Sequence, residues 1–235
     1  MATSTVEDYL KSILLAEQRD PGDRVTTGRI AAALGVAPGT ATAMVKTLSD
    51  SGLLLYEPYS GVRLSAAGRQ LAVHVLRRHR LLELFLVQVL GMDWSEVHDE
   101  AERLEHAVSD RLIERVDEML GHPATDPHGD PIPDSRGRVE QPELASLLGC
   151  PLGRPVQVVR VEDQRPEFLQ LVEREGLKPG SLVVVEDRDE AADTVALRRS
   201  AGERLRLGWR AASKILVEPP APRAAGIPPE AGGLR

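Results

Sequence analysis

Six histidine and glutamate side chains lie within 28 consecutive positions of this chain, at helical spacings within each segment: His79, Glu83, His98, Glu102, Glu105 and His106. Residues three or four positions apart share one face of an α-helix, so the side chains of each segment would point in one direction. Imidazole nitrogen and carboxylate oxygen, without thiolate, suit a hard or borderline divalent ion such as Mn²⁺ or Fe²⁺. The pattern therefore predicts a metal site.

A plainer interpretation is a solvated, charged helix face. Glutamate-rich helices with scattered histidines are common, and Arg77, Arg78, Arg80 and Arg103 could form ion pairs with this cluster. The charge distribution favours the metal. Residues 75–140 hold 8 basic and 15 acidic side chains, which accounts for the whole net charge of −7. Like charges gathered in this way repel one another unless a cation neutralises them.

The composition sets the broad class of the protein. A chain of 235 residues with 42% hydrophobic residues can form two or three small domains with ordinary cores. The sequence has no apolar run of the roughly 18 residues that a membrane span needs, and no signal peptide is visible. Its single cysteine, Cys150, excludes an internal disulfide. We therefore expect a cytoplasmic protein that does not enter a membrane.

The elements that position the cluster follow from periodicity and capping. A capping box at Ser4–Glu7 predicts a first helix to about Gln18. We expect a long helix of about 25 residues from Ser65 to Gly91, and a capping box at residues 93–96 that opens the helix holding His98 through His106. The other expected elements are helices after residues 26–27, from 38 to 51 and at 110–120, strands at 53–57 and 61–64, and a loop at 122–133.

Residues 25–64 are predicted to form helix, tight turn, helix and hairpin, which is the order of a winged helix-turn-helix. Small and hydroxyl-bearing side chains open its second helix and would fit the major groove of double-stranded DNA. The candidate DNA-binding residues are Thr27, Pro38, Thr40, Thr42, Lys46 and Arg63. The alternative is a compact helical subdomain that binds no DNA.

After residue 140 the sequence favours strands at 156–161, 182–186 and 195–199, with a helix at 166–175, as in a small β-barrel. The fold class is therefore mainly α with small β modules. The expected domains are a winged helix-turn-helix (1–73), a helical metal-binding domain (74–140), a linker (141–150), a small β-barrel (151–218) and a disordered tail (219–235).

These motifs resemble a known family. HRLLE at residues 79–83, HDEAERLEH at 98–106, Ser109-Asp110 and DPHGDPIP at 126–133 are similar to the metal-dependent regulators of the diphtheria toxin repressor and manganese transport regulator family. The resemblance spans residues 1 to about 218. It implies a homodimer that binds palindromic operator DNA, with residues 74–140 as the metal-binding and dimerisation domain. It also implies that residues 151–218 form an SH3-like β-barrel of the FeoA type.

The resemblance also implies two metal sites. The primary site would use Glu102, Glu105 and His106, completed by Asp8 of the first helix. The second site would use three further ligands and two side chains from the C-terminal module: His79, Glu83, His98, Gln164 and Glu167. The last two stand in reversed order relative to the family's iron-responsive members.

Two departures bear on the metal. Iron-responsive members carry cysteine where this chain has Glu102 and methionine where it has Asp8, and exchanging sulfur for carboxylate favours Mn²⁺. Lys11 replaces a carboxylate of the two-domain manganese regulators, which argues against their closely spaced pair of ions. The combination resembles three-domain manganese regulators. An iron(II)-dependent regulator is the alternative, and a metal-dependent enzyme is the rival from another class.

The implied mechanism starts from repulsion. Without metal, Asp8 would face Glu102 and Glu105, and the winged helix would be free to move. A divalent ion would neutralise these carboxylates and tie Asp8 to the dimerisation domain. Two recognition helices would then be held roughly 34 Å apart, matching successive major grooves.

Overall fold

The computed structural model describes residues 3–139 and 142–219, which form two compact units. The first unit comprises the chain to residue 142 together with residues 164–170, and the second comprises the rest. The expected tail at 219–235 lies almost wholly outside the described residues. No described helix has both the length and the apolar character required to cross a membrane.

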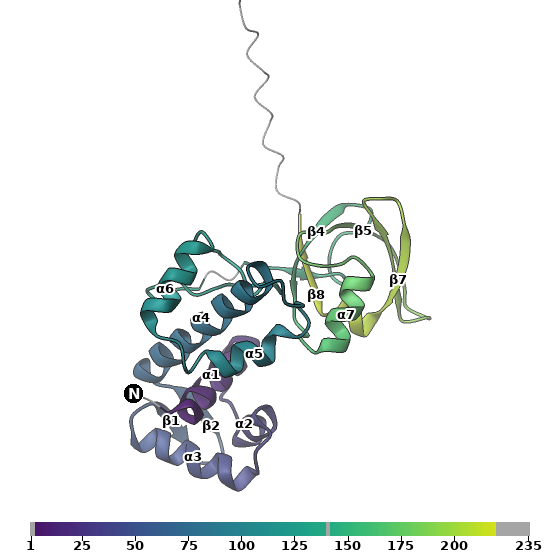
Figure 1. Cartoon of the computed structure of the whole chain (residues 1–235). Coiled ribbons are helices and arrows are strands. Elements are labelled where there is room, and N and C mark those ends of the chain that lie inside the picture. The colour runs from purple at the N-terminus through teal and green to yellow at the C-terminus, as the bar shows by residue number, and fades with distance from the viewer. Residues whose placement is uncertain (1–2, 140–141, 220–235) are drawn as a thin grey trace, which may run out of the picture. The chain divides into compact units, whose positions relative to one another are not determined.

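The first unit opens with a helical domain that carries a two-stranded hairpin (Figure 1). Its elements are α1 (Ser4–Arg19), α2 (Thr27–Leu34), α3 (Pro38–Asp50), β1 (Leu54–Glu57) and β2 (Gly61–Leu64). Thr3, and not the expected Ser4, caps α1, because its side chain accepts from the amide of Val6. Gly35 ends α2 in the left-handed conformation that favours glycine. The order predicted for a winged helix-turn-helix is confirmed.

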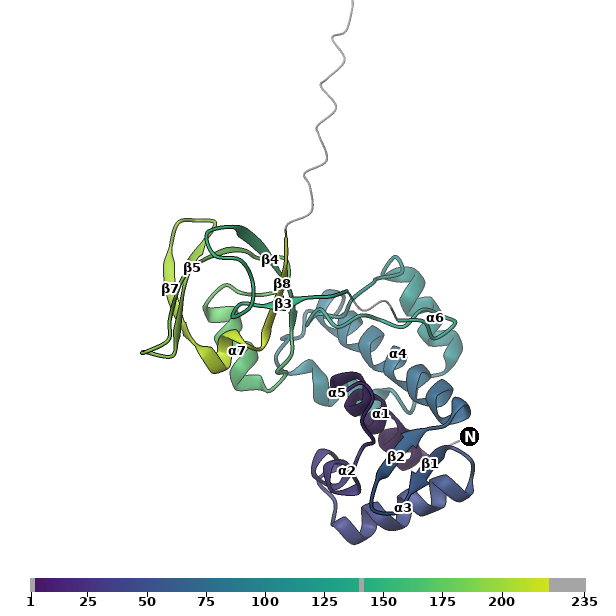
Figure 2. The ribbon, with the colours of Figure 1, turned by 180° about the vertical axis from the view of Figure 1, so that it is seen from behind.

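A long helix connects two hydrophobic cores of this unit. This is α4 (Ala66–Gln88), which is followed by α5 (Val97–Leu104) and α6 (Asp110–Met119). Leu76 of α4 packs in the core of the N-terminal domain, whereas Leu81 and Leu84 pack in the core beneath α5 and α6. Because one helix serves both cores, α1 and α5 both pack against it, and the two helices lie beside each other in Figure 2.

The second unit is built on a six-stranded antiparallel sheet in the order β3-β8-β4-β5-β6-β7. Its elements are β3 (Ala145–Ser146), β4 (Pro155–Val161), β5 (Leu182–Asp189), β6 (Thr194–Arg199), β7 (Arg204–Gly208), α8 (Trp209–Ala212) and β8 (Ile215–Glu218), and α7 (Pro166–Arg174) follows β4 in the chain. The strands β3, β7 and β8 were not predicted. Since β3 pairs with β8 and Cys150 is buried, part of the expected linker 141–150 folds with this sheet.

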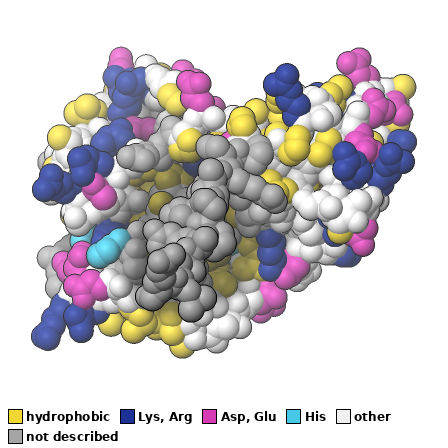
Figure 3. Space-filling view, turned by 90° about the horizontal axis from the view of Figure 1, so that it is seen from above, with side chains coloured by type: hydrophobic (Ala, Val, Ile, Leu, Met, Phe, Trp, Pro, Cys, Tyr) yellow, Lys and Arg dark blue, Asp and Glu magenta, His cyan; other side chains and the backbone are white. Residues whose placement is uncertain are grey.

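Charged side chains of both signs lie beside one another on the face shown in Figure 3. The arginines that could have paired with the His/Glu cluster pair elsewhere. Arg77 contacts Asp117, Arg78 contacts Asp110, Arg80 lies near Asp126 and Asp130, and Arg103 contacts Glu100. The charged-face interpretation therefore does not account for the cluster.

One close backbone contact fixes the start of α4 against the hairpin. A Cβ at Gly68 would lie 2.0 Å from the carbonyl oxygen of Leu53, a distance that no side chain can occupy without movement of the backbone. We expect Gly68→Ala to lower the free energy of unfolding by about 1–3 kcal/mol, as overpacking does. Gly28→Ala is the matched control, since a Cβ there meets nothing within 4 Å. Equal denaturant midpoints for the two variants would contradict this packing.

Candidate metal centre

Seven of the nine predicted ligands come from three parts of the first unit. Helix α4 carries His79 and Glu83, α1 carries Asp8, and α5 with the turn after it carries the remaining four. The predicted helix through His106 is wrong in one respect, because α5 ends at Leu104 and Glu105 is its C-cap. His106 therefore lies in the turn that follows α5.

The first ligand group joins the DNA-binding domain to that turn. Asp8, Glu105 and His106 bring one ligand atom each to within 4.8 Å of the others. Asp8 Oδ1 lies 2.9 Å from His106 Nε2, which lies 3.4 Å from Glu105 Oε1. Burial raises the pKa of Asp8 more than the charge of His106 lowers it. Asp8 Oδ1 is buried without a hydrogen bond, so this set of acceptors fits a divalent ion.

Glu7 contributes to this group, although the sequence analysis did not single it out. Its carboxylate lies 2.7 Å from His106 Nδ1, on the side of the ring opposite Asp8. Burial would lower the pKa of His106, but the hydrogen bond to Glu7 and the charge of Glu105 raise it. A carboxylate on one ring nitrogen orients the other toward a metal ion. Its position next to Asp8 was the only signal in the sequence.

Glu102, the fourth predicted primary ligand, lies outside the Asp8 group. Its Oε1 accepts a hydrogen bond of 2.6 Å from Lys11, which also donates to Glu105 Oε1 over 2.6 Å. Burial would raise the pKa of Glu102, but the charge of Lys11 and its hydrogen bond outweigh this and lower the pKa. The repulsion expected between Asp8 and the two glutamates is thus offset by a lysine. These ion pairs hold helix α1 to α5 and to its C-cap residue.

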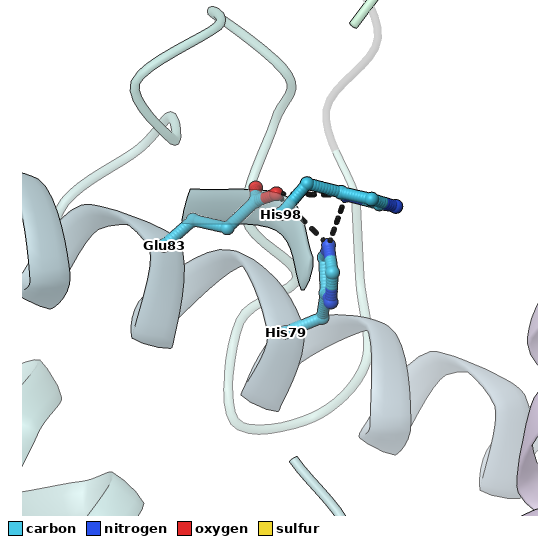
Figure 4. A group of neighbouring side chains, drawn as sticks. All are labelled: His79, Glu83 and His98. Carbon is cyan, nitrogen blue, oxygen red and sulfur yellow. Dashed lines mark hydrogen bonds and ion pairs between the residues drawn. The ribbon is translucent and has the colours of Figure 1, made fainter. Parts of the chain in front are cut away.

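The second predicted group comes together (Figure 4). His79 Nε2 lies 3.0 Å from Glu83 Oε1 and 3.2 Å from His98 Nδ1, which lies 3.1 Å from the same Glu83 oxygen. His79 Nδ1 is 2.7 Å from Glu105 Oε2. Burial lowers the pKa of His79, but Glu83 and Glu105 outweigh it and raise the value to about 9. Glu105 thus links both groups.

A third group, not predicted as ligands, shares Glu83. Asp126 and His128 lie in the loop after α6, and with Glu83 they form a fully buried set. His128 Nε2 lies 2.9 Å from the Trp94 carbonyl oxygen, so His128 Nδ1 faces Glu83 Oε2 at 3.7 Å. Burial and the neighbouring carboxylates raise the pKa of Asp126 to about 7. One atom of each member lacks a hydrogen bond. The signal available in the sequence was Asp126 and His128, two residues apart within the DPHGDPIP motif.

The two side chains expected from the C-terminal module do not join these groups. Gln164 donates a hydrogen bond of 2.8 Å to Asp130 Oδ2, within the first unit. The described residues hold four such groups, the fourth being His79, Glu102 and Glu105. Glu167 is exposed and belongs to none of them. The structure therefore gives neither residue a direct place at a ligand cluster.

The candidate DNA-binding residues lie on α2, α3 and the hairpin. Pro38, Thr40 and Lys46 are exposed on α3, whereas the hydroxyl of Thr42 donates to the Pro38 carbonyl oxygen. Thr27, the first residue of α2, is half-buried. The guanidinium of Arg63 donates to the carbonyl oxygen of Gly22, so it supports a neighbouring loop. The exposed α3 residues leave a narrow face of small side chains, as major-groove entry requires.

Comparison with known proteins identifies the class. Residues 1–62 match the family described as iron dependent repressor, N-terminal DNA binding domain. Residues 65–134 match its metal binding and dimerisation domain, and residues 145–219 match the FeoA domain. The chain belongs to this family of metal-dependent transcriptional repressors. The regulator predicted from sequence is confirmed at this level, and the enzyme alternative is dropped.

Individual relatives cover most of the chain. The iron-dependent repressor IdeR of Mycobacterium tuberculosis is 34% identical over 82% of this chain and 88% of its own length. The diphtheria toxin repressor of Corynebacterium diphtheriae is 30% identical over 79% of this chain and 85% of its own length. A solved manganese-dependent transcriptional repressor in complex with manganese is 42% identical, with a TM-score of 0.82 over 90% of this chain and 98% of that one. The solved structure of the manganese regulator SloR is 32% identical, with a TM-score of 0.73 over 92% of this chain and 98% of that one.

Glu83 belongs to two groups, so variants of the other members of each group show which of the two holds a second ion. We expect His128→Ala to reduce the Mn²⁺ bound per chain by one equivalent, since its group holds three atoms without hydrogen bonds. We expect His98→Ala to retain that equivalent. Equilibrium dialysis with metal analysis gives the count, and circular dichroism verifies folding. Loss in His98→Ala alone would assign the ion to His79, Glu83 and His98.

Proposed function

We propose that this protein is a manganese-activated transcriptional repressor that binds a palindromic operator as a homodimer and controls genes of metal homeostasis. We place it in the cytoplasm. The proposal rests on one observation above all: Asp8, from the DNA-binding domain, meets Glu105 and His106, from the metal-binding and dimerisation domain, at a single point. A ligand shifts a conformational equilibrium only through its different affinities for the two states. The metal ligands of this group come from two domains, so their set is complete only when the two domains are together, and this supplies the difference in affinity.

The residues have separate tasks in this scheme. When bound, a divalent ion supplies positive charge shared between α1 and the turn after α5. Asp8 carries that link into the DNA-binding domain, and Glu7 keeps Nε2 of His106 directed at the group. Helix α3 presents Pro38, Thr40 and Lys46 to the major groove, Lys46 to phosphate and Thr40 to base edges. We propose that Thr27, Thr42 and Arg63 lie at the border of this interface.

Manganese is favoured by the chemistry of the ligands. None of the four ligand groups among the described residues includes the thiolate of a cysteine, and oxygen-rich sites suit Mn²⁺. Relatives described as manganese-dependent support this choice. Iron(II) is the alternative, supported by the similarity to IdeR and the diphtheria toxin repressor.

The domain boundaries and the second site remain proposals. We propose modules at residues 1–73, 74–140 and 151–218, which the family matches over residues 1–62, 65–134 and 145–219 support. For the second site we retain Glu83 as the shared ligand. A contribution from Gln164 or Glu167 would require side chains to move from their present positions.

We expect Asp8→Ala to abolish metal-dependent operator binding while the dimer stays intact, because Asp8 is the only ligand of its group on the DNA-binding domain. Fluorescence anisotropy with a palindrome selected from random DNA measures binding as Mn²⁺ or Fe²⁺ is added under anaerobic conditions. Sedimentation verifies the dimer. Wild-type protein should respond at lower free Mn²⁺ than Fe²⁺.

Asp23→Ala serves as the control, since Asp23 is an exposed carboxylate in the loop between α1 and α2. It should behave as wild type. A full response of Asp8→Ala to Mn²⁺ would remove Asp8 from the switch. A response of wild type to Fe²⁺ at lower concentration than Mn²⁺ would favour the iron-dependent alternative.

A further inference from the structure

Lys11 is the only lysine buried among the described parts of the chain, with 5% of its surface exposed. A buried ammonium is costly unless it is paired and hydrogen-bonded. Lys11 meets this requirement only through Glu102 and Glu105, at 2.6 Å each. Its charge therefore lies at the junction of two metal-ligand groups, on the same helix as Asp8.

Lys11 holds the oxygen of Glu105 that a metal ion needs. Glu105 Oε2 is 2.7 Å from His79 Nδ1, which leaves Oε1 for the group with Asp8 and His106. That oxygen is the one to which Lys11 donates. An ammonium and a divalent ion repel each other, so they cannot both bind Oε1 at full strength.

Glu102, the other partner of Lys11, lies outside the Asp8 group. Glu102 Oε1, bonded to Lys11, lies 3.6 Å from His98 Nε2 and 4.0 Å from His79 Nδ1. It faces the second group in this arrangement.

We propose that Lys11 is an internal competitor for the metal ion: it occupies Glu102 and Glu105 in the metal-free protein and is displaced when a divalent ion recruits them. Activation is then an exchange of cations and not a relief of repulsion. Lys11 thereby raises the metal concentration at which the repressor responds, and keeps α1 joined to α5 until that concentration is reached. This inference rests on the proposed metal-dependent function.

The test replaces Lys11 by neutral residues and measures metal affinity directly. We expect Lys11→Met to bind Mn²⁺ about tenfold more tightly or better, because a unit charge close to the ion is removed. Free Mn²⁺ is followed by electron paramagnetic resonance. The metal-free variant should also unfold at a lower temperature than wild type and gain more from Mn²⁺, because two buried carboxylates lose their cation.

Two further variants keep the inference falsifiable. Lys11→Gln is neutral but can still donate hydrogen bonds, so it should fold if Lys11→Met does not, and should also bind Mn²⁺ more tightly. Lys178→Met removes one charge from a half-buried lysine of the second unit that pairs with Glu173, and it should bind as wild type does.

Unchanged or weaker Mn²⁺ binding by both Lys11 variants would overturn the proposal and make Lys11 a structural support of the site. That result is distinguishable from failure of the proposed function. In the latter case operator binding by the wild-type protein would not depend on Mn²⁺, whatever the Mn²⁺ affinities of the Lys11 variants.

Discussion

The carboxylate of Glu105 is the interaction on which the arrangement of the first unit depends. It is fully buried, with one oxygen bonded to Lys11 of α1 and the other to His79 of α4. A buried carboxylate that loses a partner is strongly destabilising. Helices α1 and α4 and the turn after α5 must therefore keep their positions relative to one another. Any movement of the DNA-binding domain through α1 changes the charge balance at the ligand groups.

Helix α4 extends this constraint to both domains of the first unit. Its first half packs in the core of the DNA-binding domain and its second half in the core beneath α5 and α6. His79 and Glu83 lie on that second half, so the ligand groups are built on the helix that both cores share. Helices are stiff over this length, which makes the relative position of the two domains sensitive to contacts between α1 and α5.

The acidic excess of residues 75–140 divides into two populations. Asp110, Asp117 and Glu100 are neutralised by arginines. The carboxylates of the ligand groups have histidines or Lys11 as neighbours instead, and Asp126 alone among them also lies near an arginine, Arg80. Histidine must be neutral to bind a metal, and a carboxylate must be ionised, so protons and metal ions compete for these groups. The arginine pairs stabilise the fold without taking part in that competition.

Much of this protein is determined locally by its sequence. Helical periodicity, caps and glycine stops are properties of short segments, so they predicted α1, α3, α4 and the hairpin within a few residues. The structure also brings together His79, Glu83 and His98, the group that the family resemblance implied, because α5 packs against α4.

Only the tertiary structure decided which side chains face one another across the chain. Glu7 and His106 are 99 positions apart, and Lys11 and Glu102 are 91 apart. No periodicity relates residues at such distances. The position of Glu102 beside Lys11, and the burial of Asp126 and His128 against Glu83, depend on how α1 and the loop after α6 pack around α4. The sequence by itself determined the kinds of ligand, and packing decided which of them share a site.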